Sequence, residues 1–189
     1  MNLPNKLTLM RVILIPFFMF FLLTDFFAAS GLAALIIFGA ASITDFLDGY
    51  LARKNNLVTT FGKFLDPLAD KILVVAALVC FVKLGRVGAV PVCIIVFREF
   101  FVQGLRLVVV NDGVVVAAGF MGKLKTAFTM CALVVLLVFN AANGLGLHSG
   151  YTTLMTVIEQ SLIWISTLLT VISGMQYFNA YKGYINSDK

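Results

Sequence analysis

The sequence has few charged residues and few of the residues that usually build metal or disulfide sites. Only 12% of its 189 residues are Asp, Glu, Lys or Arg, and it contains one His and three Cys. Soluble domains carry about 25% charged residues, so the chain lacks the polar surface of a soluble globule. Because 61% of its residues are hydrophobic, a disordered chain is excluded as well.

The three cysteines and the net charge each exclude a class of protein. Cys80, Cys93 and Cys131 lie in apolar runs with no Cys-x-x-Cys pair, which is typical of packing residues and not of a zinc site or a disulfide framework. The net charge of +5 comes from scattered cations that form no run, so we expect no nucleic-acid partner. Cytoplasmic loops that attract anionic lipid or phosphate explain the charge better.

Long apolar runs are what the sequence has instead. Its mean hydropathy is +1.02, and a membrane span needs about 20 mostly apolar residues. Segments with Gly, Asn or charge separate six such runs. We therefore expect a single all-α integral-membrane domain over residues 1–189, a bundle of six transmembrane helices. The expected helices are 7–27, 31–54, 64–84, 88–110, 121–142 and 152–182.

The N-terminal run also resembles a signal peptide, because Lys6 and Arg11 flank an apolar stretch that is followed by small residues. Asp25 and the immediate start of a second apolar run favour a hairpin of two spans. If six helices alternate, most cations lie on one side, and Lys83 and Arg86 lie on the other. The positive-inside rule then predicts a multi-pass protein of the cell (inner) membrane, with both termini and the active site cytoplasmic.

Four of the nine acidic residues fall between positions 45 and 70, near the expected ends of the second and third helices. Asp45 and Asp48 are spaced i, i+3, and Asp66 and Asp70 are spaced i, i+4, so each pair shares one helix face. A short connection predicts antiparallel neighbours, which would bring the pairs together. Helix capping explains a single aspartate, such as Asp66 before Pro67, but four on two facing helices favour a metal site.

Two divalent cations would supply the charge that four carboxylates need, since Arg53 alone cannot. Oxygen ligands without a nearby His or thiolate favour Mg²⁺, with Mn²⁺ as the second choice. Gly49 and Gly62 lie in register with the aspartates and would let a bulky phosphate group approach the helix backbone. Close helix packing is the alternative explanation for these glycines. Asp70 is the last acid on its helix face.

The segment 45–70 resembles the signature of the CDP-alcohol phosphatidyltransferase family. That signature is Asp-x-x-Asp-Gly-x-x-Ala-Arg, eight residues, then Gly-x-x-x-Asp-x-x-x-Asp, and it covers 26 of the 189 residues. The matching positions are Asp45, Asp48, Gly49, Ala52, Arg53, Gly62, Asp66 and Asp70.

The resemblance implies a six-helix membrane enzyme that transfers a phosphatidyl group from CDP-diacylglycerol to an alcohol and releases CMP. It also implies roles for single residues. Asp45, Asp48 and Asp66 would be metal ligands, and Asp70 would touch metal and act as the base on the incoming hydroxyl. The CDP pocket would be lined by Gly49, Ala52, Arg53 and Gly62, with Asn5 and Thr8 bonding the nucleotide or its phosphates.

The acceptor implied by the resemblance is glycerol 3-phosphate, and the product is phosphatidylglycerol phosphate. Segments 2–8, 66–71, 98–100 and 122–126 are most similar to family members that use this acceptor. A phosphorylated acceptor needs cations near Asp70, and the candidates are Arg98, Arg106, Lys123 and Lys125. A buried ion pair with Glu99 is the alternative for Arg98, and ordinary cytoplasmic cations for Lys123 and Lys125.

Other functions stay open at this point. A different acceptor, such as inositol phosphate, serine or phosphatidylglycerol, would use the same signature. A divalent-cation transporter also needs intramembrane acids, although these would lie at the midplane and often in two repeats. A polyprenyl transferase would lack the Asp-Gly-x-x-Ala-Arg element. The family resemblance allows a homodimer, and we expect His148 to be solvated and Trp164 to face lipid or to pack.

Overall fold

The computed structural model describes residues 3–24, 26–55, 60–111, 119–147 and 153–185; its side chains are described for 8–24, 26–44, 68–69, 71–107, 109, 119–147 and 153–183. All six expected helices are present. The largest differences are four residues: the first helix begins and ends four residues earlier than expected, and the third begins four residues earlier. The helices are α1 (Leu3–Leu23), α2 (Ser30–Asn55), α3 (Thr60–Lys83), α4 (Ala89–Asn111), α5 (Phe120–Gly144) and α6 (Thr153–Ile185).

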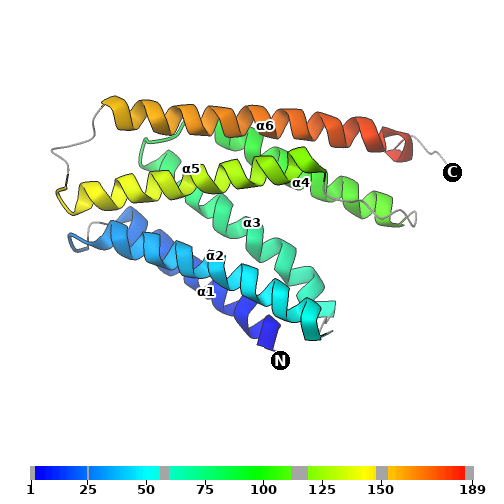
Figure 1. The fold of residues 1–189 in the computed structure, drawn as a ribbon, viewed down its shortest axis with the longest axis horizontal. Helices are drawn as coiled ribbons and strands as arrows, with labels where there is room; N and C mark the ends of the chain where they lie inside the picture. Colours follow the sequence, from blue (N-terminus) through cyan, green and yellow to red (C-terminus); the bar gives the residue numbers. More distant parts are fainter. Residues whose placement is uncertain (1–2, 25, 56–59, 112–118, 148–152, 186–189) are drawn as a thin grey trace.

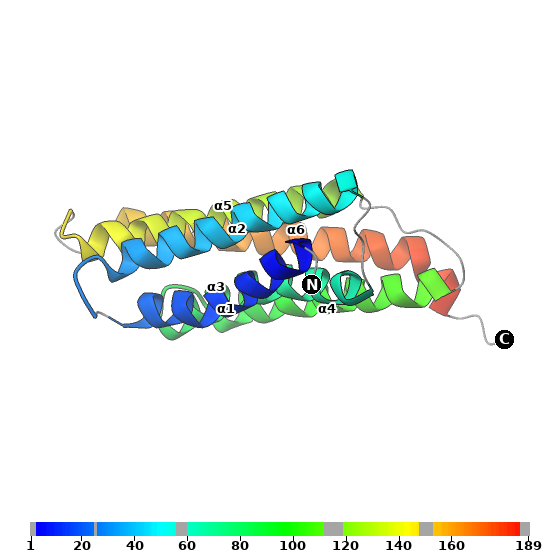
Figure 2. The same ribbon diagram turned by 90° about the horizontal axis from the view of Figure 1, so that it is seen from below.

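The helices form a bundle in which the chain runs back and forth along one long axis (Figures 1 and 2). α1 packs against α2 and α3, α6 packs against α4 and α5, and α2 packs against α5. α2 and α3, expected as antiparallel neighbours, have few contacts over the residues that the structure describes, where α1 packs against both of them.

The alternating directions place six helix ends at one end of the bundle. The start of α1, the end of α2, the start of α3, the end of α4, the start of α5 and the end of α6 all point this way, to the right in Figure 1. We call this the site end and the opposite one the turn end. The sequence predicts the same grouping from its cations, which cluster near these helix ends.

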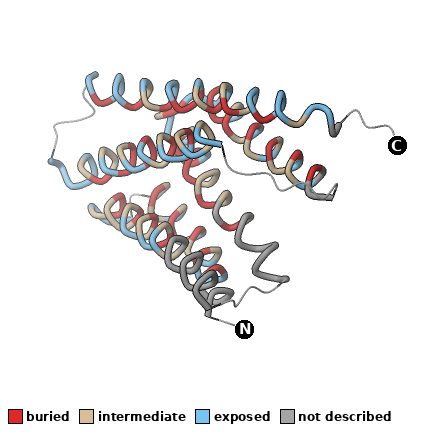
Figure 3. The backbone as a smooth tube through the Cα atoms, turned by 45° about the vertical axis from the view of Figure 1, so that its right-hand side comes forward, coloured by how far each residue is buried: buried red, intermediate tan, exposed pale blue. Residues whose placement is uncertain are grey.

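The apolar core lies mainly toward the turn end. The rings of Phe18 and Phe38 join α1 to α2 with their centroids 5.6 Å apart. Leu78, Leu133 and Ile163 add fully buried side chains from α3, α5 and α6. Figure 3 shows these buried positions on the inner faces of the helices, with exposed positions on the outer faces.

A tight turn at the turn end carries a charged contact into the bundle. Gly85 adopts a φ of +70°, which favours glycine, and the amide of Arg86 donates to the carbonyl of Phe81 at 3.0 Å. The Arg86 guanidinium forms an ion pair with the buried Glu159 of α6 and donates to Asn140 Oδ1 at 3.2 Å. Arg86 therefore ties the α3–α4 turn to α5 and α6, whereas the sequence suggested only a loop cation.

The outer surface is rich in large apolar side chains. Phe97, Leu107, Trp164 and Leu168 are all more than half exposed, which is unusual for a soluble protein and suits contact with lipid. Within the described ranges, two helices are long and apolar enough to cross a membrane, α5 and the segment Thr153–Gly183 of α6. Thr8–Leu23 and Ser30–Thr44 are apolar but shorter.

The cysteines only partly match their interpretation as packing residues. Cys80 is buried in the core, as expected, whereas Cys93 and Cys131 are exposed, and all three are free thiols. For Cys93 and Cys131 the packing interpretation is wrong, because an apolar run in a membrane protein has outward positions as well as inward ones. His148 lies outside the described residues.

Candidate functional site

Buried and half-buried polar side chains gather in the half of the bundle toward the site end, within the described part of the chain. They come from five helices, and their grouping follows from the alternating chain direction, which superimposes the start of α5 on the later halves of α4 and α6. The members are Thr8, Arg11, Lys71, Arg98, Glu99, Gln103, Arg106, Lys125, Thr129, Ser166, Ser173 and Tyr177.

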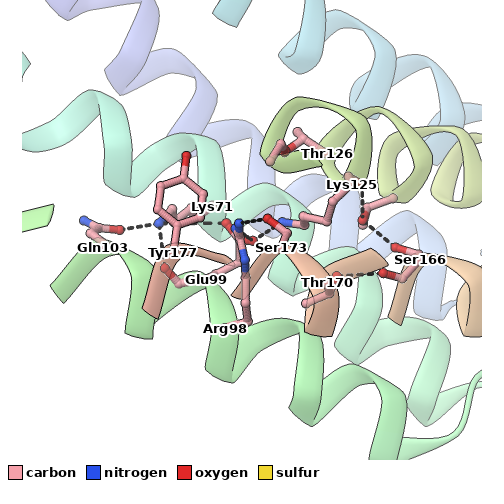
Figure 4. A network of polar contacts seen from close by, with 12 residues as sticks. Lys71, Arg98, Glu99, Gln103, Lys125, Thr126, Ser166, Thr170, Ser173 and Tyr177 are labelled. Carbon is pink, nitrogen blue, oxygen red and sulfur yellow. Dashed lines mark hydrogen bonds and ion pairs between the residues drawn. The ribbon is translucent and has the colours of Figure 1, made fainter. Parts of the chain in front are cut away.

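Glu99 of α4 is the centre of this cluster (Figure 4). Its carboxylate accepts a hydrogen bond from the ammonium of Lys125 on α5, whose side chain is 4% exposed, and another from Arg98 Nη1 at 3.2 Å. Lys71 of α3 lies 3.9 Å from the second carboxylate oxygen. One acid therefore holds cations from three helices in a poorly hydrated region, where charges must be paired to be tolerated.

Lys71 is held by further oxygen atoms of α4. Its ammonium donates to the backbone carbonyl of Glu99 at 3.0 Å and to Gln103 Oε1 at 2.5 Å. Lys71 directly follows Asp70 in α3. The cationic cluster and the proposed base are therefore adjacent on the chain.

Arg98 extends from the cluster to the outer face of the bundle. Its Nη2 donates to Ser173 Oγ at 2.5 Å, and a Cβ on Gly174 would come within 3.2 Å of its Cγ, so a larger residue there would require the Arg98 side chain to shift. The stem of Arg98 also borders a groove of about 430 Å³ between α4 and α6. The groove is lined mainly by apolar side chains, including Phe97, Phe101 and Met175.

Arg106 lies about two turns beyond Arg98 on α4, and its partner is a tyrosine. Its Nη2 donates to the hydroxyl of Tyr177 at 3.0 Å, and its Cζ lies 5.4 Å from the centroid of the Tyr177 ring. The Nε atoms of Arg98 and Arg106 are buried and have no hydrogen-bond partner among the described residues. Both guanidinium groups therefore retain donors that an anion could use.

The structure brings together three of the four cations that the sequence assigns to an acceptor phosphate. Arg98 and Lys125 share Glu99, and Arg106 lies beside Tyr177, which also contacts Arg98. The ion pair of Arg98 with Glu99, considered from the sequence as the alternative to a substrate role, is present. Lys123 is exposed and not part of this cluster, and its role stays a prediction. Thr8 is fully buried near the start of α1.

The remaining predicted residues lie on described helices, but their side chains lie outside the described residues. By the helix bounds, five of these residues lie on the site-end part of α2 and three on the site-end part of α3. Because α3 begins at Thr60, Asp66 lies inside the helix and not at its N-cap, so capping does not account for it. The residues are Asn5 on α1; Asp45, Asp48, Gly49, Ala52 and Arg53 on α2; and Gly62, Asp66 and Asp70 on α3.

The donor set on α2 and α3 suits a hard divalent cation. It consists of carboxylates in pairs one helical turn apart, on helix ends that only residues 56–59 separate. The side chains of these four aspartates lie outside the described residues, so their joint metal site stays a prediction. Among the described side chains, no three His, Cys, Asp or Glu residues group as a metal site.

Sequence reasoning missed several members of the cluster. Lys71, Gln103, Ser173 and Tyr177 were not singled out, and Glu99 was considered only as a partner of Arg98. One signal was present, since polar residues are costly within apolar helices and tend to face one another. Their partners could not be identified, because these contacts join residues 26 to 75 positions apart.

The described helices form an all-helical bundle with an apolar outer surface and a cluster of cations at one end, the architecture of a helical membrane protein. The sequence model of the CDP-alcohol phosphatidyltransferase family matches residues 1–172, and the chain belongs to this family. Members of the family generally use divalent metal ions. Family membership and the two apolar helices together indicate a membrane protein.

Relatives with curated names agree on one activity. A Bacillus subtilis protein is 43% identical over 94% of both chains, and a Rickettsia typhi protein is 40% identical over 97% of this chain and 98% of its own. A Haemophilus influenzae protein is 38% identical over 96% of this chain and 94% of its own. Each is named CDP-diacylglycerol–glycerol-3-phosphate 3-phosphatidyltransferase.

Proposed function

We propose that the protein transfers the phosphatidyl group of CDP-diacylglycerol to glycerol 3-phosphate, giving phosphatidylglycerol phosphate and CMP. The names of relatives that are similar over nearly the whole chain support this reaction. The structural observation that carries it is the buried cationic cluster. Two arginines, Arg98 and Arg106, keep buried Nε donors without a partner among the described residues.

The cationic cluster suits a phosphorylated acceptor better than a neutral one. A buried guanidinium is costly unless an anion or an oriented group offsets its lost hydration. Glycerol 3-phosphate brings a phosphate that can accept paired hydrogen bonds from arginine. An acceptor without an anionic group would leave these donors unused. We assign the acceptor phosphate to Arg98, Arg106 and Lys125, with Lys123 at the exposed start of α5.

The four aspartates of α2 and α3 are the proposed metal ligands. Two Mg²⁺ ions, or Mn²⁺ in their place, would be held by Asp45, Asp48, Asp66 and Asp70. When bound, the metal supplies positive charge to the diphosphate of the donor lipid and to the leaving CMP. The CDP group is assigned to Gly49, Ala52, Arg53 and Gly62, with Asn5 and Thr8 from α1.

Asp70 is the proposed general base. Its carboxylate takes the proton of the acceptor hydroxyl as that oxygen bonds to the phosphorus of the phosphatidyl group. The bond from this phosphorus to the bridging oxygen breaks at the same centre, and CMP leaves with the electron pair. Lys71, the next residue of α3, belongs to the cationic cluster, so the proposed base and the phosphate site are close on one helix.

The proposed setting is the cell (inner) membrane. All six helices would span it, with both termini and the site end in the cytoplasm, where CDP-linked lipid headgroups and glycerol 3-phosphate are both accessible. The cations near the site end support this orientation through the positive-inside rule. A homodimer is compatible with the apolar outer surface.

A direct assay tests the proposed function. Purified protein in detergent or liposomes is given CDP-diacylglycerol, Mg²⁺ and one acceptor at a time, and CMP release is measured. We expect release with glycerol 3-phosphate and little with inositol phosphate, serine or phosphatidylglycerol. CMP release with a different acceptor only would reassign the substrate. No CMP release with any acceptor would favour a cation transporter, and a measurement of metal flux into liposomes would test that function.

A further inference from the structure

Tyr177 of α6 lies where three parts of the site end meet, and it is 6% exposed. Its ring is near two guanidinium groups, with the Cζ of Arg98 5.5 Å and the Cζ of Arg106 5.4 Å from the ring centroid. Its hydroxyl accepts hydrogen bonds from Arg106 Nη2 and from the backbone amide of Gly119, both at 3.0 Å. Figure 4 shows Tyr177 beside the network of Glu99 and Arg98.

The contact with Gly119 connects the tyrosine to the start of α5. Gly119 is the N-cap residue of that helix, and a Cβ on Gly122 in the first turn would lie 3.4 Å from the Tyr177 hydroxyl. The start of α5 is therefore held against the same side chain that holds Arg106. Lys125 lies further along α5. Because Tyr177 contacts both Arg106 of α4 and the start of α5, it fixes the position of the α4 cations relative to those of α5.

A tyrosine partner leaves the charge of an arginine intact. A ring face and a hydroxyl oxygen replace part of the lost hydration without adding negative charge. Arg86 at the turn end shows the contrast, since a carboxylate from Glu159 neutralises it. This contrast holds for Arg106, which has no carboxylate partner among the described residues, so its charge is available to an anion, whereas Arg98 also pairs with Glu99.

We infer that Tyr177 is a positioning residue for the acceptor phosphate: it holds Arg98, Arg106 and the start of α5 so that their donors converge on one phosphate group. The inference rests on the proposed function, because it takes the phosphate of glycerol 3-phosphate as the group that is bound. Tyr177 itself does not touch the reacting atoms. Its effect should therefore appear in acceptor binding and not in the chemical step.

The test compares Tyr177→Phe and Tyr177→Leu with wild type. Tyr177→Phe keeps the ring and removes the hydroxyl, and we expect the KM for glycerol 3-phosphate to rise about tenfold, the effect of one hydrogen bond to a charged group. The kcat and the KM for CDP-diacylglycerol should stay within about twofold. Tyr177→Leu removes the ring as well and should raise the acceptor KM further.

Thr167→Val is the matched control. Thr167 is a buried hydroxyl on the same helix that donates only to the carbonyl of Ile163 at 2.8 Å, so its loss should leave the acceptor KM unchanged. In an Arg106→Ala background, Tyr177→Phe should have little further effect, because its main partner is gone. Equal changes in both substrate KM values, or an additive effect in that background, would overturn the positioning role.

Calorimetric binding of glycerol 3-phosphate to the same proteins separates two kinds of failure. Wild type that binds glycerol 3-phosphate but releases no CMP would overturn the proposed function, and the weaker binding expected of Tyr177→Phe would still support the positioning role. Wild type that releases CMP, with Tyr177→Phe unchanged in KM and in binding, would overturn the inference alone. Absence of binding to wild type would overturn both.

Discussion

The ammonium of Lys125 on α5 contacts the carboxylate of Glu99 on α4, inside the site-end half of the bundle. The same carboxylate is shared with Arg98 of α4 and approached by Lys71 of α3. Three cations therefore depend on one acid for their relative positions. This arrangement keeps them close to one another without removing the positive character of the site.

Replacing Glu99 by Gln should destabilise the protein strongly. The change leaves buried cations without their shared counter-charge, which costs about 3–5 kcal/mol when one partner of a buried pair is lost. Unfolding by denaturant in detergent measures the effect. Lys83→Ala, an exposed cation at the end of α3, is the control and should change stability by less than about 0.5 kcal/mol. Near-wild-type stability of Glu99→Gln would mean that the cluster is well hydrated.

Glu159→Gln should affect stability without affecting catalysis. Glu159 is 1% exposed at the side chain and pairs with Arg86 at the turn end, so its loss should lower the free energy of unfolding by about 3 kcal/mol. The turnover of the folded fraction should remain within about twofold of wild type, because the site end is at the other end of the bundle. A fall in kcat at full folding would show that the two ends are coupled.

Asp70→Asn should abolish turnover and leave the fold intact. A general base contributes about 10²–10⁴ in rate, and loss of a metal ligand would add to this. CMP release measures the rate, and the melting temperature in detergent reports on folding. A folded variant with normal turnover would remove Asp70 from the base role.

Removal of divalent metal should stop the reaction reversibly. Treatment with a chelator is expected to end CMP release, and added Mg²⁺ should restore it, with Mn²⁺ restoring at least part of it. Ca²⁺ has the same charge but prefers a larger, more flexible oxygen shell, so it should support less turnover. Full activity after exhaustive chelation would contradict the assignment of the four aspartates as metal ligands.

Much of the fold and part of the site were predictable from the sequence. Apolar runs bounded by Gly, Asn and charge predict all six helices, because burial and span length act locally along the chain. The signature around Asp45 and Asp70 predicts the family, which the comparisons confirm. The packing of α1 against both α2 and α3 was not predictable, since a short link constrains only the helix ends that it joins.

The sequence does not show which residues pair with the buried polar side chains. Arg86 and Arg98 are both arginines in apolar surroundings, yet one is neutralised by Glu159 and the other reaches a shared carboxylate and a serine. Which of these occurs depends on how α6 packs against α4 and α5. No local pattern encodes that packing.

The sequence by itself determined that this chain is a bundle of apolar helices with an acidic signature near two of their ends, because hydropathy and residue spacing are local properties. Only the tertiary structure decided that Glu99 would gather Lys71 and Lys125 and that Tyr177 would contact two arginines. The physical reason is that a buried charge takes its partner from whatever helix lies beside it, and that neighbour is set by packing across the whole bundle.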